Sequence, residues 1–71
     1  MQNKIKQYRT QLDLTQEQLA EKVQVSSRTI ISLEKGKYKP SIMLAYRLSL
    51  LFDCRIEDLF QLKENLALEE S

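Results

Sequence analysis

The side chains that could carry out chemistry in this 71-residue chain are few. There is no His, which removes the commonest acid–base group and the commonest metal ligand. Cys54 is the single cysteine, so neither an intrachain disulfide nor a zinc site is expected, and packing as a small apolar residue is favoured over a redox switch. Gly36 is the single glycine, which excludes a glycine-rich phosphate loop. With no residue pair to nominate as catalytic, we expect no enzyme, no metal and no cofactor.

Recognition chemistry is indicated instead by residues 27–33, which read Ser-Arg-Thr-Ile-Ile-Ser-Leu. In a helix, consecutive side chains point about 100° apart, so Ile30 and Ile31 cannot both face a core. Ile30 fits a buried stripe with Leu33, and Ile31 is therefore expected to point outward. A thymine methyl group in the DNA major groove is an apolar partner for such an exposed side chain.

Arg28 lies near the start of the same segment, and its guanidinium fork matches the two acceptors on the major-groove edge of guanine. Ser27 and Ser32 are short and can reach either bases or phosphates. No series of aromatic residues is interleaved with basic ones, so duplex DNA is favoured over single strands or RNA. No small-molecule ligand is evident.

These residues need a helix pair to position them, and the sequence predicts one. Thr15 begins a capping-box pattern that ends at Gln18, which predicts a helix over about residues 16–23. Ser26 is a good N-cap for a second helix that ends near Gly36. About three residues, 24–26, separate the two helices, a spacing typical of a helix-turn-helix.

The rest of the chain is also predicted to be helical, because no segment alternates with period two for long. A helix beyond Ser41 and a short one over residues 56–60 complete the expected set, while residues 61–71 suit a helix or a short strand equally. The expected core-facing side chains of the first and fourth helices are Ile5, Tyr8, Arg9 and Leu12, and Leu44, Ala45, Leu48 and Phe52. Phe60 is expected in the core with Tyr8 and Phe52.

The sequence resembles the Cro/C1-type (Xre) helix-turn-helix family over residues 4–60. The resemblance is carried by four stretches: Thr15 to Val23, Val25-Ser26 with Thr29-Ile30, Leu33 to Gly36 continuing to Pro40-Ser41, and Ile56 to Phe60. It implies an all-α, five-helix lambda-repressor-like DNA-binding domain over residues 1–60, with the helix-turn-helix at about residues 16–34. Residues 61–71 would form a short C-terminal tail. Members of the family are transcriptional regulators, usually repressors and usually dimers.

The resemblance also implies roles for individual residues. The base-reading positions of the family fall on Ser27, Arg28, Ile31 and Ser32, in agreement with the helix geometry. The positions that contact the DNA backbone fall on Gln16, Ser26, Lys35, Lys37 and Lys39. A solvated glutamine and a solvated basic loop remain the alternatives for Gln16 and the three lysines.

Two further positions are interpreted through the family. Arg9 and Glu34 match an ion pair that would position the first helix against the end of the third, although Arg9 could also lie near a phosphate. Gln24 stands where family members often have Gly in a left-handed conformation. We expect Gln24 to adopt that conformation at a cost of about 1 kcal/mol.

The charge of the chain is divided between its two parts. Residues 1–47 carry nine Lys/Arg and four Asp/Glu, a net charge of +5, whereas residues 48–71 carry two and six, a net charge of −4. This indicates a basic working face and an acidic C-terminal end. A surplus apolar stripe, Met43, Tyr46 and Leu50, lies on the fourth helix, and the candidate dimer contacts are Leu50, Phe60, Leu62 and Leu66. The alternative is that the tail folds back over the stripe within one monomer.

The expected function is that of a homodimeric transcriptional regulator, a repressor that binds double-stranded DNA at a palindromic operator. The alternative is an antitoxin-like interaction module that neutralises a partner protein and represses its own gene. No apolar run approaches the roughly 20 residues of a membrane span, and no apolar stretch follows Met1-Gln2-Asn3-Lys4, so we expect a cytoplasmic protein that does not engage a membrane.

Overall fold

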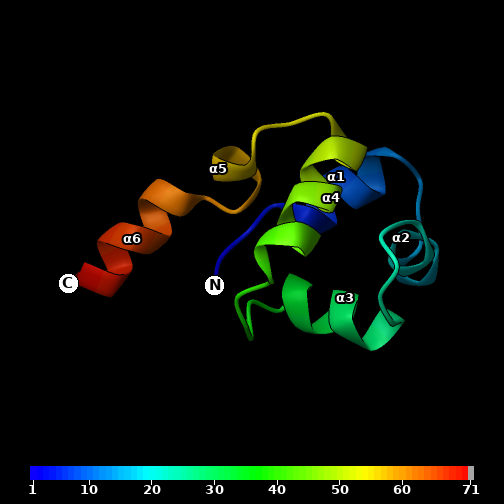
Figure 1. Cartoon of the computed structure of the whole chain (residues 1–71), viewed down its shortest axis with the longest axis horizontal. Coiled ribbons are helices and arrows are strands. Elements are labelled where there is room, and N and C mark those ends of the chain that lie inside the picture. Colours follow the sequence, from blue (N-terminus) through cyan, green and yellow to red (C-terminus); the bar gives the residue numbers. More distant parts are fainter. Residues whose placement is uncertain (71) are drawn as a thin grey trace.

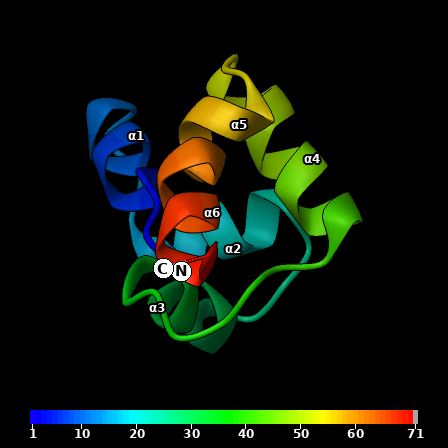
Figure 2. The same ribbon diagram turned by 90° about the vertical axis from the view of Figure 1, so that its left-hand side faces the viewer.

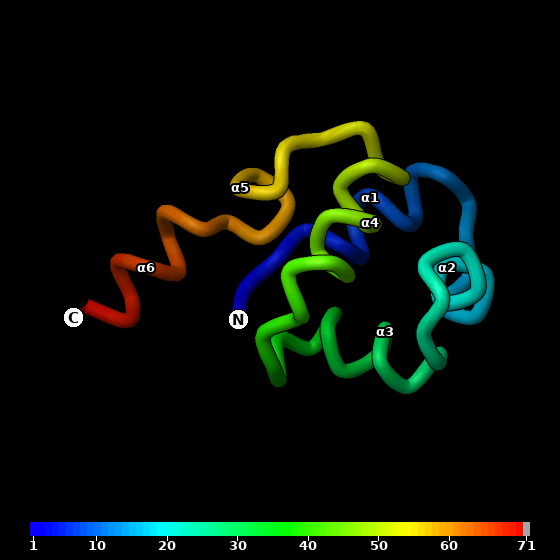
Figure 3. Tube along the Cα trace, in the orientation of Figure 1, coloured from blue at the N-terminus to red at the C-terminus, as the bar shows by residue number. Residues whose placement is uncertain are grey.

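The computed structural model describes residues 1–70, so the last residue of the expected 61–71 tail lies outside the described part. Within residues 1–70 the chain is all-helical, as predicted, with no strand. Its elements, drawn in Figures 1 and 3, are α1 (Ile5–Gln11), α2 (Gln16–Lys22), α3 (Ser27–Glu34), α4 (Ile42–Phe52), α5 (Ile56–Leu59) and α6 (Leu62–Glu70).

The pair α2 and α3 forms the predicted helix-turn-helix. The hydroxyl of Thr15 accepts from the backbone N–H of Gln18, and the Gln18 side chain accepts in return from the N–H of Thr15, which completes the capping box. Ser26 caps α3 by accepting from the N–H of Thr29. Gln24, in the turn, has a φ of 63°, so the prediction of a left-handed glutamine is confirmed.

The core lies where α1, the helix-turn-helix, α4 and α5 meet. Each helix contributes the side chains of one face, which is why helical spacing alone identified most of them. Tyr8 stacks on Phe52 with ring centroids 5.5 Å apart, and Cys54 packs against the edge of the same core. Its fully buried larger side chains are Ile5, Leu19, Val23, Ile30, Leu33, Leu48, Leu59 and Phe60.

Three expectations need correction or completion. Leu12 is half exposed because α1 ends at Gln11, so it does not continue the buried face of that helix. Phe60 is only 1% exposed within one monomer, so it packs in the core and is not available as a surface contact between subunits. The ambiguous tail forms α6, a sixth helix beyond the five of the expected domain.

The sixth helix extends away from the remaining helices toward one end of the molecule. In Figure 1, α3 runs along the lower edge of the molecule. Viewed from that end, the two chain ends lie close together in projection (Figure 2). Figure 1 shows that the two ends are separated along the long axis of the molecule, and the part of α6 that contacts the N-terminal segment is Asn65, whose side chain bonds the backbone N–H and carbonyl of Gln2. Among the described residues, no helix is both long enough and apolar enough to cross a lipid bilayer.

Candidate nucleic-acid interface

One face of α3 is buried in the core, and the opposite face is exposed to solvent. Ile30 and Leu33 are fully buried and fix the rotation of the helix about its axis. Because residues 27, 28, 31 and 32 fall within about 140° of one another around a helix, they share the opposite side. On that side Arg28 is exposed, and Ser27, Ile31 and Ser32 are partly exposed. The four candidate base-reading residues therefore form one continuous surface.

A polar network joins this helix to the start of α2. The Arg9 guanidinium donates from Nε to Oε2 of Glu34 over 2.6 Å and from Nη2 to Oε1 over 3.2 Å, a two-pronged ion pair. Its Nη1 donates to the carbonyl of Leu14 over 2.8 Å. The side chains are only 11% and 5% exposed, so the pair is shielded from water. The structure thus brings Arg9 and Glu34 together, with Arg9 held by protein atoms on three nitrogens.

Gln16 belongs to the same network. Its amide Nε2 donates to Oε1 of Glu34 over 3.1 Å, and it stands at the first position of α2, next to the capping Thr15. Gln16 is half-buried, so part of the side chain faces solvent. Free N–H groups at a helix N-terminus favour anions such as phosphate. The bond to Glu34 therefore fixes the candidate backbone contact at a place suited to a phosphate.

The hydroxyl of Ser26 is less free to contact a phosphate than expected, because it is already hydrogen-bonded. Its hydroxyl oxygen accepts from the N–H of Thr29 over 3.2 Å and lies 3.1 Å from the Thr29 hydroxyl. The cap occupies the hydroxyl in the unbound protein. A phosphate contact by Ser26 would have to share this group with Thr29.

The loop after α3 carries three exposed lysines, Lys35, Lys37 and Lys39. Gly36 between them has a φ of 73°, the left-handed stop expected for the helix. A Cβ at Gly36 would approach the carbonyl oxygen of Met1 to 3.0 Å. Both its conformation and its surroundings therefore favour glycine at this position.

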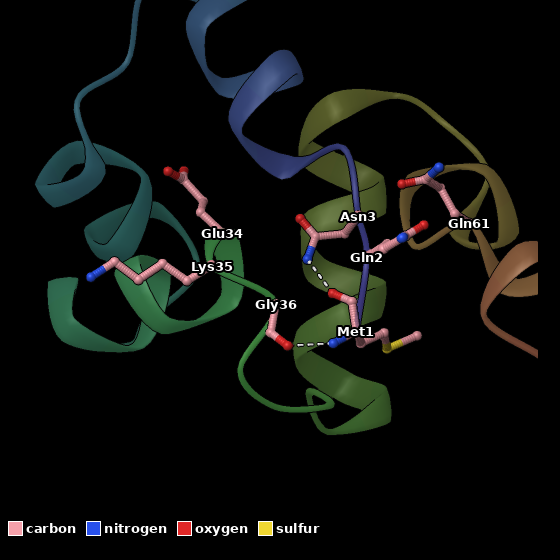
Figure 4. Close-up of a pocket in the computed structure, with 7 residues that line it drawn as sticks. All are labelled: Met1, Gln2, Asn3, Glu34, Lys35, Gly36 and Gln61. Atoms are coloured by element: carbon pink, nitrogen blue, oxygen red, sulfur yellow. Dashed lines mark hydrogen bonds between the residues drawn. The ribbon is translucent and has the colours of Figure 1, made fainter. Parts of the chain in front are cut away.

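The N-terminal segment braces this loop, a feature that the sequence did not reveal (Figure 4). The amino group of Met1 donates to the carbonyl of Gly36, and the Asn3 amide donates to the carbonyl of Leu33 over 2.7 Å. The Asn3 amide is a second donor to the carbonyl of Leu33, which also accepts from the backbone N–H of Gly36 over 2.9 Å, and Met1 bonds the carbonyl of the residue in the left-handed turn. A contact across some 30 residues between a side chain and a backbone group leaves no periodic signal, so pattern analysis could not find it.

Lys39 differs from the other two lysines. Its Nζ forms an ion pair with Glu69 near the end of α6, and both side chains are largely exposed. Exposed pairs of this kind contribute little stability, about 0–1 kcal/mol. Lys39 therefore points toward α6 in the unbound protein, while Lys35 and Lys37 have no ion pair in the described structure.

Cys54 and Tyr8 lie away from this surface. Burial raises the pKa of the Cys54 thiol and also raises the pKa of the Tyr8 hydroxyl. A raised pKa keeps the thiol protonated and unreactive near neutral pH. This agrees with a packing role for Cys54.

Comparisons with known proteins agree with a helix-turn-helix in this chain. A helix-turn-helix family model matches residues 5–59. The chain is 53% identical over 60 residues to an HTH-type transcriptional regulator of Methanocaldococcus jannaschii, covering 84% of this chain and 91% of that protein. It is 52% identical over 60 residues to one of Archaeoglobus fulgidus (84% and 86%), and 50% over 66 residues to one of Methanothermobacter thermautotrophicus (92% and 96%). The resemblance seen in the sequence is confirmed: the chain belongs to the Cro/C1-type helix-turn-helix family of DNA-binding transcriptional regulators.

Proposed function

We propose that the protein is a homodimeric repressor of the cytoplasm that binds a palindromic operator in double-stranded DNA. In this proposal α3 of each subunit enters a major groove. The observation that carries it is the division of α3 between a buried face, Ile30 and Leu33, and an outer face with Arg28 at its exposed N-terminal end. A recognition helix needs this division, because the core must hold its orientation while the outer side chains read base edges.

The backbone contacts would come from both ends of the helix-turn-helix. Gln16, fixed by Glu34, and Ser26 lie at the starts of α2 and α3, where helix N-termini favour phosphate. Lys35 and Lys37 follow the end of α3, with Lys39 able to join once Glu69 releases it. Such contacts set orientation and salt-dependent affinity, while Ser27, Arg28, Ile31 and Ser32 would set the sequence. A dimer covering two successive grooves would exclude other proteins from that DNA, which is why repression is the proposed direction.

In vitro selection of bound duplexes from a random pool tests the proposal. We expect a palindromic consensus with one G·C pair and one A·T pair in each half-site at the positions facing Arg28 and Ile31. A selected pool with no consensus, or with a consensus that contains a single half-site, would contradict binding of a palindromic operator by a homodimer.

An antitoxin-like role is the second candidate, because exposed apolar side chains on α4 and α6 could hold a different protein. Purification of the chain from its own cells, at the expression level of those cells, distinguishes the two. A second protein present in equal amounts would favour the antitoxin-like role, and recovery of the chain with itself alone would favour the homodimer.

A further inference from the structure

The N-terminal segment, residues 1–4, is hydrogen-bonded to two different parts of the fold. The backbone N–H of Lys4 donates to the carbonyl of Leu59 in α5 over 2.8 Å. The Asn65 side chain on α6 bonds the backbone N–H and carbonyl of Gln2. On its other side the segment bonds the end of α3. The helices α5 and α6 therefore fix the position of a segment that in turn holds α3.

The Asn3 side chain uses both ends of its amide. Its Oδ1 accepts from the backbone N–H of Ile5, the first residue of α1, over 3.1 Å. Its Nδ2 donates to the carbonyl of Leu33 over 2.7 Å and to the carbonyl of Met1 over 3.2 Å. In Figure 4 the side chain points from the N-terminal segment toward the end of α3. One half-buried residue thus joins the start of α1 to the end of α3.

The end of α3 is the turn from which two of the proposed backbone contacts project. The N–H of Gly36 donates to the carbonyl of Leu33 over 2.9 Å. The N–H of Lys37 donates to the carbonyl of Ser32 over 3.1 Å, which completes a Schellman motif. Lys35 precedes the left-handed Gly36 and Lys37 follows it. The shape of this turn therefore decides where the two lysine side chains leave the chain and which phosphates they can reach.

The N-terminal segment bonds this turn at two points, and Asn3 controls both. Asn3 donates directly to the carbonyl of Leu33. The Met1 nitrogen donates to the carbonyl of Gly36, which belongs to the peptide that leads to Lys37. Asn3 holds Met1 in place by donating to its carbonyl. Loss of the Asn3 amide donor would therefore release the turn at both points.

We infer that Asn3 is a positioning residue for DNA binding, which acts by holding the turn after α3 in the shape from which Lys35 and Lys37 contact phosphates. Asn3 acts through the turn and does not itself contact DNA. Ordering a loop on binding costs affinity, so a loop that is ordered in advance binds more tightly. The inference rests on the proposed function and adds to it a residue outside the helix-turn-helix.

Two variants of the full chain remove the donor in different ways. In Asn3→Asp the carboxylate has nearly the shape of the amide and can still accept from the N–H of Ile5, but it cannot donate to Leu33. Asn3→Ala removes the donor without adding a charge. Both variants should weaken binding to every duplex similarly and reduce the slope of log affinity against log salt concentration by roughly one. Gln7→Glu, on the exposed side of α1, makes the same change from amide to carboxylate and should keep the slope of the wild type.

A double-mutant cycle separates positioning from a general loss of stability. In the wild-type background Lys37→Ala should reduce the salt slope by roughly one. In the Asn3→Ala background the same change should alter the slope little, because the displaced lysine no longer contacts a phosphate. A merely structural role for Asn3 would lower the denaturation midpoint and leave the effect of Lys37→Ala intact. Additive changes in slope would therefore overturn the inference.

Hydrogen exchange supplies a readout that needs no DNA. The N–H groups of Gly36 and Lys37 close the turn, so they should exchange severalfold faster in both Asn3 variants, while the N–H groups inside α2 keep their rates. Circular dichroism should show that the variants retain the helices of the wild type. Unchanged exchange at the turn would overturn the inference alone. A wild type that binds no duplex, although the turn loosens in the variants, would instead refute the proposed function, and the inference would fall with it.

Discussion

Glu34 holds several helices together and also borders the surface proposed to bind DNA. One carboxylate receives Arg9 from α1 and Gln16 from α2 while sitting at the end of α3. The structure therefore extends the expected Arg9–Glu34 pair by a third member. Gln16 depends on this carboxylate for its orientation, so a change at Glu34 should affect both stability and phosphate contact.

Glu34→Ala should lower the free energy of unfolding by about 3 kcal/mol, because it leaves the shielded guanidinium of Arg9 without its partner. Urea denaturation measures the loss. Replacing both partners, with Arg9→Met and Glu34→Leu, should cost clearly less than the two single changes added together, because no charge is then stranded. Additive losses would show that the pair does not act as a unit.

Gln24→Gly should raise the free energy of unfolding by about 1 kcal/mol. The left-handed φ of 63° strains a residue with a Cβ, and glycine relieves the strain. Gln7→Gly is the matched control, because Gln7 is exposed within α1 and the same change should cost about 1 kcal/mol there. Equal effects of the two variants in thermal denaturation would contradict a strained turn.

Arg28→Ala should weaken binding to the selected operator by about 1–3 kcal/mol and relax the preference at one G·C pair in each half-site. Ile31→Ala should act in the same way but more weakly at an A·T pair, since it removes only an apolar contact. Fluorescence anisotropy at one fixed salt concentration compares the operator with a scrambled duplex. Equal losses on both duplexes would mean that these side chains do not read bases.

At the scale of the elements, local signals were sufficient for the helix-turn-helix. Capping at Thr15 and Ser26 and the left-handed stop at Gly36 are properties of adjacent residues, so the sequence indicates them directly, whereas the left-handed conformation of Gln24 is implied by the resemblance to the family. For the C-terminal tail, local signals were not sufficient. Its leucines suit a helix or a strand equally, and the bonds of Asn65 to Gln2 that hold α6 against the N-terminal segment join distant parts of the chain.

The same distinction separates what could and could not be predicted of the site. Helix periodicity alone places Ile31 and Arg28 on one face of α3. In contrast, the brace of Met1 and Asn3 and the pairing of Lys39 with Glu69 arise only from folding. Phe60 was assigned both to the core and to the dimer surface, and only the three-dimensional packing decides for the core.

The loop lysines should not be equivalent. Lys37→Ala should weaken binding to every duplex similarly and reduce the slope of log affinity against log salt concentration by roughly one. Lys39→Ala should have a smaller effect, because DNA must first displace Glu69, and Glu69→Gln should raise affinity. Lys6→Ala, on the exposed side of α1, is the control with the same loss of charge. An equal change in slope for Lys37→Ala and Lys6→Ala would show only a general effect of net charge.

At the scale of the whole molecule, the basic part of the chain is also the part that carries the surface proposed to bind DNA. The basic part contains α3 and its lysine loop, whereas the acidic part contains α6. The proposed homodimer would therefore need to leave the basic part of each subunit free to face DNA.

This arrangement predicts a strict spacing between half-sites. In the proposed two-fold dimer the recognition helices should lie about 34 Å apart, so that they meet successive major grooves on one side of the duplex. Inserting five base pairs at the centre of the selected operator rotates one half-site by about half a helical turn, to the opposite side of the DNA. Affinity should then fall to that of a single half-site. The control is an operator with the same number of base pairs replaced at its centre and none inserted, which should bind as the original does. Gel-shift titrations at fixed salt concentration compare the three duplexes. If the five-base-pair insertion left affinity unchanged, the two subunits could not be held in one rigid arrangement, and the proposed dimer would not set the spacing of the operator.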